Sequence, residues 1–174
     1  MELELKALAT ADLPFAQAVF ESVLPLYREL MPGAFEENLK IVAILIENEL
    51  DFSATGLNAE LIQVKGQAQG FLAWARLEKG PAYLASLHFL PVARRQGWGG
   101  LALALLEDQL KRQGLPALYL LAHAQADWAL DFYLKQGYAR LAEAPADILR
   151  LAGTQIQHLL MPGMVLMGKE WSIV

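Results

Sequence analysis

The sequence of 174 residues contains no cysteine. Disulfide bonds, thiolate metal sites and a cysteine nucleophile are therefore excluded. The three histidines, His88, His123 and His158, show no metal-ligand spacing such as H-x-x-x-H, and we expect no bound metal. No uninterrupted apolar run reaches the roughly 18 residues that a membrane span requires. The first residues, MELELKALATADLP, include early acidic side chains and no basic region before an apolar core, unlike a signal peptide. We expect a cytoplasmic protein with no membrane partner.

Positive charge is also scarce. The chain has 14 Lys and Arg against 19 Asp and Glu, which gives a net charge of −5 and argues against nucleic acid as a partner. Hydrophobic residues make up 55% of the chain, and the mean hydropathy is +0.29. This apolar surplus is enough for a sizeable core and is compatible with a homodimer, without fixing the oligomeric state. No repeat or linker divides the chain, so we expect one domain over residues 1–174.

Hydrophobic periodicity predicts an α+β protein. Helix-start residues at 10–14 precede a helix that Pro25 should kink or divide, and the helix after Gly100 should bury Leu101, Leu105, Leu106 and Leu110. A four-residue turn is expected at 66–69. Residues 143–163 give no clear pattern. The predicted strands are 2–8, 58–65, 70–78, 82–90, 117–122, 138–142 and 165–170, and the other predicted helices are 34–49 and 125–136.

The stretch Leu87–Gly100, LHFLPVARRQGWGG, dominates the sequence. A strand that ends in a glycine-rich turn and opens a helix is a place for phosphate, because glycine allows close approach to the main chain and the helix start offers free N–H groups. Arg94 and Arg95 would add positive charge there. The Gly-Lys-Ser/Thr of a Walker loop and the spacing of the dinucleotide fingerprint are both missing.

Two motifs carry a family resemblance. Arg94-x-x-Gly97-x-Gly99 is similar to the acyl-CoA pyrophosphate loop of the GNAT (GCN5-related N-acetyltransferase) family. The later run Ala129-x-x-Phe132-Tyr133-x-x-x-Gly137-Tyr138 resembles a second motif of that family, in the same order and at a suitable distance. The resemblance covers 82–138 strongly, 1–81 only in the pattern of elements, and 143–174 weakly. It implies the GNAT acyl-CoA N-acyltransferase fold, a central mixed, mostly antiparallel sheet with helices on both faces.

The resemblance also implies a mechanism. Acetyl-CoA would be the cosubstrate, with its pantetheine between splayed fourth and fifth strands and paired with the backbone of Leu87 and Phe89. The pyrophosphate would take N–H groups from Arg95, Gln96, Gly97, Trp98, Gly99 and Gly100, with the Arg94 side chain close by. A primary amine of a small molecule or peptide would attack directly, and Tyr133 would act as general acid. A phenol with a pKa of about 10 can protonate a thiolate whose pKa is about 8.5 at little cost.

The general base is left open by the sequence. The fourth strand carries Ser86 and His88 but no carboxylate, although many family members have a glutamate on that strand or a neighbouring one. His88 suits a base by its ordinary pKa range but equally suits a structural role. His123, after the fifth strand, is a second candidate. Glu60 and Glu78 could act through water, or the proton could pass through water to bulk solvent.

The acceptor pocket is expected around the early helices and the sheet. Trp74, Tyr27, Arg28 and Phe35 are candidates to shape it, with a core position for Trp74 and a solvated helix face for Arg28 as the alternatives. Trp98 should pack the helix start against the sheet. Other classes of function remain: a CoA-binding regulatory module without turnover, or an interaction protein on the same fold. The acceptor and the length of the acyl chain cannot be read from the sequence.

Overall fold

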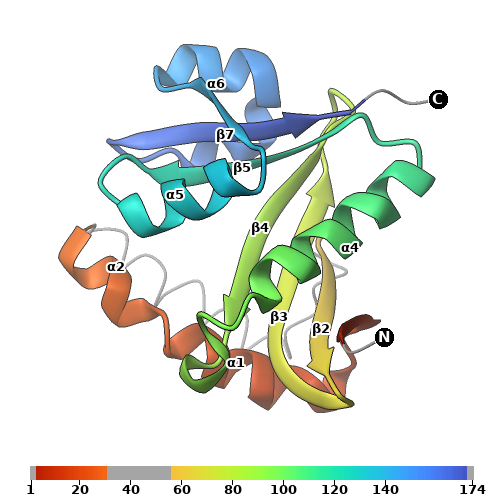
Figure 1. The fold of residues 1–174 in the computed structure, drawn as a ribbon. Helices are drawn as coiled ribbons and strands as arrows, with labels where there is room; N and C mark the ends of the chain where they lie inside the picture. Colours follow the sequence, from red (N-terminus) through yellow and green to blue (C-terminus); the bar gives the residue numbers. More distant parts are fainter. Residues whose placement is uncertain (1–2, 31–55, 172–174) are drawn as a thin grey trace. The chain divides into compact units, whose positions relative to one another are not determined.

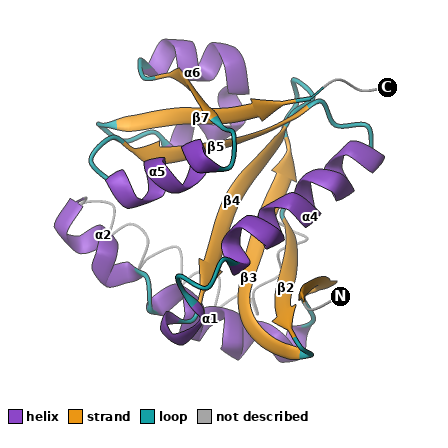
Figure 2. Ribbon diagram, in the orientation of Figure 1, coloured by secondary structure: helices purple, strands orange, loops and turns teal. Residues whose placement is uncertain are grey.

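The computed structural model describes residues 3–30 and 56–171 (Figure 1). The predicted helix 34–49 and Phe35 lie outside these ranges, as does the side chain of Tyr27. The described helices and strands are mixed along the chain, as expected of an α+β protein (Figure 2). They are β1 (Leu3–Ala7), α1 (Leu13–Glu21), α2 (Leu24–Leu30), β2 (Asn58–Val64), β3 (Gln67–Arg76), β4 (Ala82–Phe89), α4 (Trp98–Arg112), β5 (Ala117–His123), α5 (Asp127–Lys135), β6 (Ala139–Ala142), α6 (Pro145–Ala152) and β7 (Met164–Glu170).

Within the described ranges the strands form one seven-stranded sheet in the order β1-β2-β3-β4-β5-β7-β6. The pairs β1/β2, β2/β3, β5/β7 and β6/β7 are antiparallel, and β4/β5 is parallel. The prediction of a mixed, mostly antiparallel sheet is therefore confirmed. A parallel pair needs a long crossover connection, and α4 lies in the segment that joins β4 to β5.

The chain divides into two compact units, each built from separate stretches of sequence. The first unit comprises Met1–Trp74 and Ser86–Leu106, and the second comprises Ala75–Ala85 and Glu107–Val174. In the first unit, α1 buries Ala16 and Val19 against Phe71 of β3. The break between α1 and α2 falls at residues 22–23, with Pro25 in the first turn of α2, so the predicted division of this helical segment is confirmed.

The hairpin of β2 and β3 corrects one prediction. The turn is the two-residue pair Lys65-Gly66 rather than residues 66–69, because Val64 pairs directly with Gln67. Both turn residues have positive φ, 51° for Lys65 and 76° for Gly66. Two positive φ values match the right-handed twist of the strands they join. A lysine in this conformation is uncommon, and the sequence gives little warning of it.

The second unit has its own apolar core. Segment 143–163, left open by the sequence, forms α6 and a 3₁₀ turn, Thr154–Leu159, whose buried Ile148, Ala152 and Ile156 join this core. The rest of the core comes from Leu77, Tyr83, Ala117, Tyr119 and Leu166.

The prediction that Leu101 is buried in α4 is wrong. The helix begins at Trp98, and Leu101 is 52% exposed, whereas Ala102, Leu103, Leu106 and Leu110 are buried. At about 100° per residue, Leu101 lies about 140° around the helix axis from the buried Leu106, which places it on the solvent side.

Candidate functional site

The loop between β4 and α4 has the shape that the sequence predicts for a phosphate site. After β4 come a short 3₁₀ turn, Pro91–Ala93, and the residues Arg94–Gly97. Arg95 and Gly97 have positive φ, 62° and 84°. The first intrahelical bond of α4 runs from the Leu101 N–H to the Gly97 carbonyl, at 3.4 Å. Helix geometry leaves the preceding N–H groups at the start of α4 without intrahelical acceptors, so these groups are suited to an anion.

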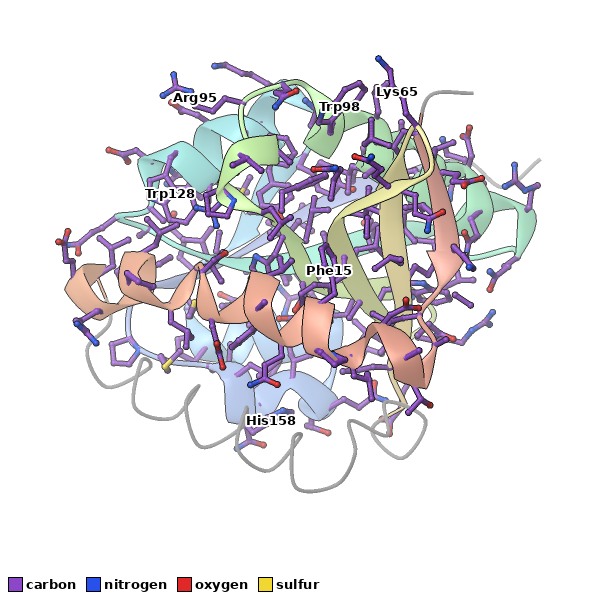
Figure 3. All side chains as sticks on the ribbon, turned by 90° about the horizontal axis from the view of Figure 1, so that it is seen from below. Phe15, Lys65, Arg95, Trp98, Trp128 and His158 are labelled. Carbon is purple, nitrogen blue, oxygen red and sulfur yellow. The ribbon has the colours of Figure 1, made fainter. Side chains whose placement is uncertain are left out.

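The side chains of this loop differ in their exposure to solvent. The Arg95 side chain is exposed and extends away from the ribbon (Figure 3). Trp98 is half-buried, and its indole N–H donates to Gln96 Oε1 at 3.3 Å. Gln96 in turn donates to the Val92 carbonyl at 2.7 Å. Trp98 and Gln96 therefore link the first turn of α4 to the short turn before it.

Arg94 is held by contacts inside the first unit. Its Nε donates to the Phe89 carbonyl at 3.0 Å. Its Nη2 donates to Ser22 Oγ at 2.8 Å and to the Ser22 carbonyl at 3.4 Å. Ser22 lies just after α1, far away in the sequence, and no sequence motif identifies it. The guanidinium thus connects the end of β4 with the end of α1.

His88, one candidate base, lies between aromatic rings of the same unit. Its ring contacts Phe20 and Phe71 edge-on, with centroid distances of 5.9 Å and 5.8 Å. Desolvation by burial, and then the positive charge of Arg94, lower the pKa of His88 from 6.5 to about 4. The imidazole is therefore neutral near pH 7 and binds a proton only weakly.

The backbone of β4 is tightly enclosed near His88. A Cβ added to Gly70 of β3 would lie 2.3 Å from the His88 carbonyl oxygen and 3.1 Å from Phe89 Cα. Leu90 N–H donates to the Gln69 carbonyl at 2.9 Å. The absence of a side chain at Gly70 lets β3 approach β4 here. Cofactor pairing with the backbone of Leu87 and Phe89 stays a prediction.

Glu60 and Trp74 form a buried polar pair of the first unit. Glu60 of β2 is 8% exposed and Trp74 of β3 is 4% exposed. The indole N–H of Trp74 donates to Glu60 Oε1 at 3.0 Å. This is the core position that the sequence offered as the alternative for Trp74. Arg28 on α2 and Glu78 after β3 are both exposed.

In the second unit, β4 and β5 pair in parallel at Ala82↔Leu118 and Tyr83↔Tyr119. The last residue of β5 is His123, which pairs with Met164 of β7. Its Nδ1 accepts a hydrogen bond from the Gln125 N–H at 3.2 Å. A neutral ring with Nδ1 as acceptor carries its hydrogen on Nε2, so His123 has no free lone pair in this arrangement.

Tyr133, the predicted acid, lies on α5 and is half-buried. Its ring contacts Phe132 and Tyr138 edge-on, with centroid distances of 5.0 Å and 5.6 Å. Its carbonyl accepts from the Tyr138 N–H at 3.0 Å, beside Gly137 with its φ of 85°. This is the glycine-ended helix terminus that the sequence predicts.

A buried carboxylate that the sequence did not single out lies next to Tyr138. Glu107 on α4 is 5% exposed. Its Oε1 accepts from Tyr138 Oη at 3.0 Å, and its Oε2 accepts from Lys169 Nζ at 2.7 Å. Lys169 also donates to the Gln136 carbonyl at 3.0 Å. Burial and the Glu107 charge both raise the pKa of Tyr138 far above its usual range, so its hydroxyl stays protonated.

Two expected absences concern membranes and metals. Over the part of the chain that the structure describes, no helix combines the length and the apolar character needed to cross a bilayer. Within residues 3–30 and 56–171, no three His, Asp or Glu side chains gather as they would around a metal ion.

The sheet order and the β4–α4 loop agree with the fold that the two sequence motifs imply. A family model described as "Acetyltransferase (GNAT) family" matches residues 20–138. The chain belongs to the GNAT acetyltransferase family. Among curated protein sequences, none matches significantly.

Solved structures support the same fold. A PaiA N-acetyltransferase from Thermoplasma acidophilum, in complex with coenzyme A, has a TM-score of 0.73 at 16% identity, over 98% of this chain and 100% of that one. An acetyltransferase from Thermus thermophilus has a TM-score of 0.68 at 20% identity, over 98% of both chains. A ribosomal-protein-alanine N-acetyltransferase from Brucella melitensis has a TM-score of 0.61 at 14% identity, over 97% of this chain and 99% of that one.

Proposed function

We propose that this protein transfers an acetyl group from acetyl-CoA to a primary amine of a small molecule or peptide. The observation that carries the proposal is the β4–α4 loop, with positive φ at Arg95 and Gly97 directly before the first turn of α4. Family membership and the coenzyme A bound by the Thermoplasma protein support the choice of anion. The loop N–H groups from Arg95 to Gly100 would bind the pyrophosphate.

In this reaction the neutral amine nitrogen attacks the thioester carbonyl carbon to form the carbon–nitrogen bond, the carbon–sulfur bond breaks, and coenzyme A leaves as the thiolate. The excess proton on the nitrogen passes to solvent, and solvent returns a proton to the acid that protonates the thiolate. We assign to Tyr133 the proton that this thiolate takes up, since a phenol is acidic enough for the task. The second motif of the family supports this role. Tyr138 holds Tyr133 in place, because its N–H donates to the Tyr133 carbonyl and the two rings pack edge-on.

The acceptor ammonium must lose a proton before its nitrogen can attack, and the surroundings of His88 and His123 favour bulk water as the acceptor of that proton. His88 has a pKa of about 4 and is a weak acceptor. The Nδ1 atom of His123 is occupied by the Gln125 N–H. A profile of kcat/KM against pH tests the assignment: with solvent as acceptor, the rate rises with the fraction of free amine and keeps the same profile in His88→Gln and His123→Gln. An inflection that disappears in either variant identifies that histidine as the base.

Calorimetric titration with acetyl-CoA, with ATP and NAD as controls, tests the cofactor. We expect saturable binding of acetyl-CoA alone, followed by thiol release when a suitable amine is added. Gly97→Glu should abolish binding, because it puts a carboxylate into an anion site. Gly114→Glu is the matched control: both glycines are exposed, both have positive φ (84° and 75°), and neither has an atom within 4 Å of an added Cβ. Equal affinity in both variants would contradict the loop assignment.

The alternative of a coenzyme A-binding regulatory protein without turnover is favoured by one observation, the absence of a strong base on β4. It predicts saturable binding with no thiol release for any amine over the whole pH range. A single amine that releases thiol at a rate dependent on Tyr133 rules it out.

A further inference from the structure

Arg94 occupies the first position of the loop motif, where the family resemblance places it beside the cofactor. Its guanidinium is nevertheless directed at protein acceptors, the Phe89 carbonyl and the hydroxyl and carbonyl of Ser22. All of these groups belong to the first unit. The arginine therefore joins two segments of the protein in addition to carrying a charge.

We propose that Arg94 is a positioning residue, which together with Ser22 clamps the end of α1 to the end of β4 and so holds the cofactor loop in its binding shape. This proposal rests on the proposed function, because it assigns the loop to acetyl-CoA. It gives Ser22, at the junction of α1 and α2, a role in cofactor affinity although it lies outside the loop.

The chemistry of Ser22 suits this role. Its hydroxyl donates to the Val19 carbonyl at 2.6 Å, so the oxygen is oriented to accept from Arg94 Nη2 at 2.8 Å. The Ser22 carbonyl lies at the C-terminal end of α1, where the helix dipole favours a cation. Hydrogen bonds with a charged donor are stronger than those between neutral groups. Serine and arginine therefore stabilise the same helix end.

The position of Arg94 transmits this constraint to the loop. Nε and Nη2 lie on one edge of the rigid guanidinium plane, so bonding both fixes the direction of the side chain. Arg95 follows immediately with its φ of 62°, a conformation that a non-glycine residue keeps only when its surroundings impose it. With Arg94 anchored, the backbone at Arg95 has little freedom to relax.

A double-mutant cycle distinguishes a clamp from direct contact with the phosphates. Ser22→Ala, Arg94→Gln and the double variant are titrated with acetyl-CoA. We expect each single variant to weaken binding about tenfold, and the double variant to bind no more weakly than Arg94→Gln, because both changes break one interaction. Ser22→Thr, which keeps the hydroxyl, should restore affinity. Arg112→Gln removes the same charge from the exposed end of α4 and should bind as the wild type.

A different pattern overturns the proposal. If Arg94→Gln weakens binding while Ser22→Ala leaves it unchanged, Arg94 contacts the cofactor directly and the clamp has no functional role. Amide hydrogen exchange over residues 95–100 in the cofactor-free protein gives a readout independent of the proposed function. Both variants should speed exchange there, and unchanged exchange overturns the clamp even if the wild type binds acetyl-CoA. If the variants exchange faster than the wild type over residues 95–100 but the wild type binds no acetyl-CoA, the clamp is supported and the proposal of acetyl-CoA as cosubstrate is refuted.

Discussion

The burial of His88 makes the stability of this protein sensitive to mild acid. In the unfolded chain a histidine has a pKa of about 6.5, whereas His88 in the folded protein has a pKa of about 4. Between these values the unfolded state binds a proton that the folded state does not. The free energy of unfolding is therefore unaffected by His88 above about pH 6.5, and it decreases as the pH falls from there toward 4, because protons bind to the unfolded state.

The linkage relation gives the size of the effect. At pH 5 nearly all unfolded molecules but only about a tenth of folded ones carry the proton, which corresponds to about 2 kcal/mol against about 0.2 kcal/mol at pH 7. His88→Gln has no ionisable ring, so its free energy of unfolding should fall by about 2 kcal/mol less than that of the wild type between pH 7 and pH 5. Because the His88 side chain is only partly buried, this difference is an upper value.

Urea unfolding at pH 7 and pH 5 measures the difference directly. The quantity to compare is the change in unfolding free energy between the two pH values, because His88→Gln also alters packing against Phe20 and Phe71 at every pH. His158→Gln, at an exposed position on the 3₁₀ turn, is the control and should follow the wild type. Equal pH dependence in His88→Gln and the wild type would refute the reasoning.

Three further predictions concern the rest of the framework. Gly70→Ala should lower the stability by about 2 kcal/mol or more, seen as a lower melting temperature, because its Cβ would meet the His88 carbonyl oxygen at 2.3 Å. Lys169→Met should cost about 3 kcal/mol in urea unfolding, since it leaves the buried Glu107 carboxylate without its cation, and adding Glu107→Gln should recover part of that loss. Tyr133→Phe should lower kcat about tenfold or more with an unchanged Kd for acetyl-CoA, and an unchanged kcat removes it as the acid.

Much of the fold was predictable because apolar periodicity follows directly from burial. β5 could be recognised as a wholly apolar run, and its residues 117–120 are all buried. One failure occurred where a single backbone conformation decides the outcome: the positive φ of Lys65 shortened the hairpin turn and leaves no periodic signal in the sequence. The other concerned helical phase: Leu101 lies about 140° around the axis of α4 from the buried Leu106, outside the apolar stripe.

The candidate site divides in the same way. Its loop was found because glycines and arginines close together in sequence form one structural unit. Side chains that pair across long stretches of sequence were missed in both units: in the first, Ser22 lies 72 residues from Arg94, and in the second, Lys169 lies 62 residues from Glu107. One sequence contains no sign that such residues meet. A serine after a helix and a lysine on a strand are residue types common at the surface, and only the structure shows which partners they contact.

Arg94 shows why charge in a motif is a poor guide to the charge that a ligand meets. Nε and Nη2 of its guanidinium bond protein oxygens, and its positive charge helps to keep His88 unprotonated. A protonated His88 would put a second cation near Arg94, between the rings of Phe20 and Phe71, where it is less well solvated than in the unfolded chain. The Arg94–Ser22 clamp therefore favours a neutral His88. It disfavours the protonated form that His88 would have to adopt as a general base. The same arginine that fixes the loop makes β4 a poor place for a base, which is why we assign the proton of the amine to solvent.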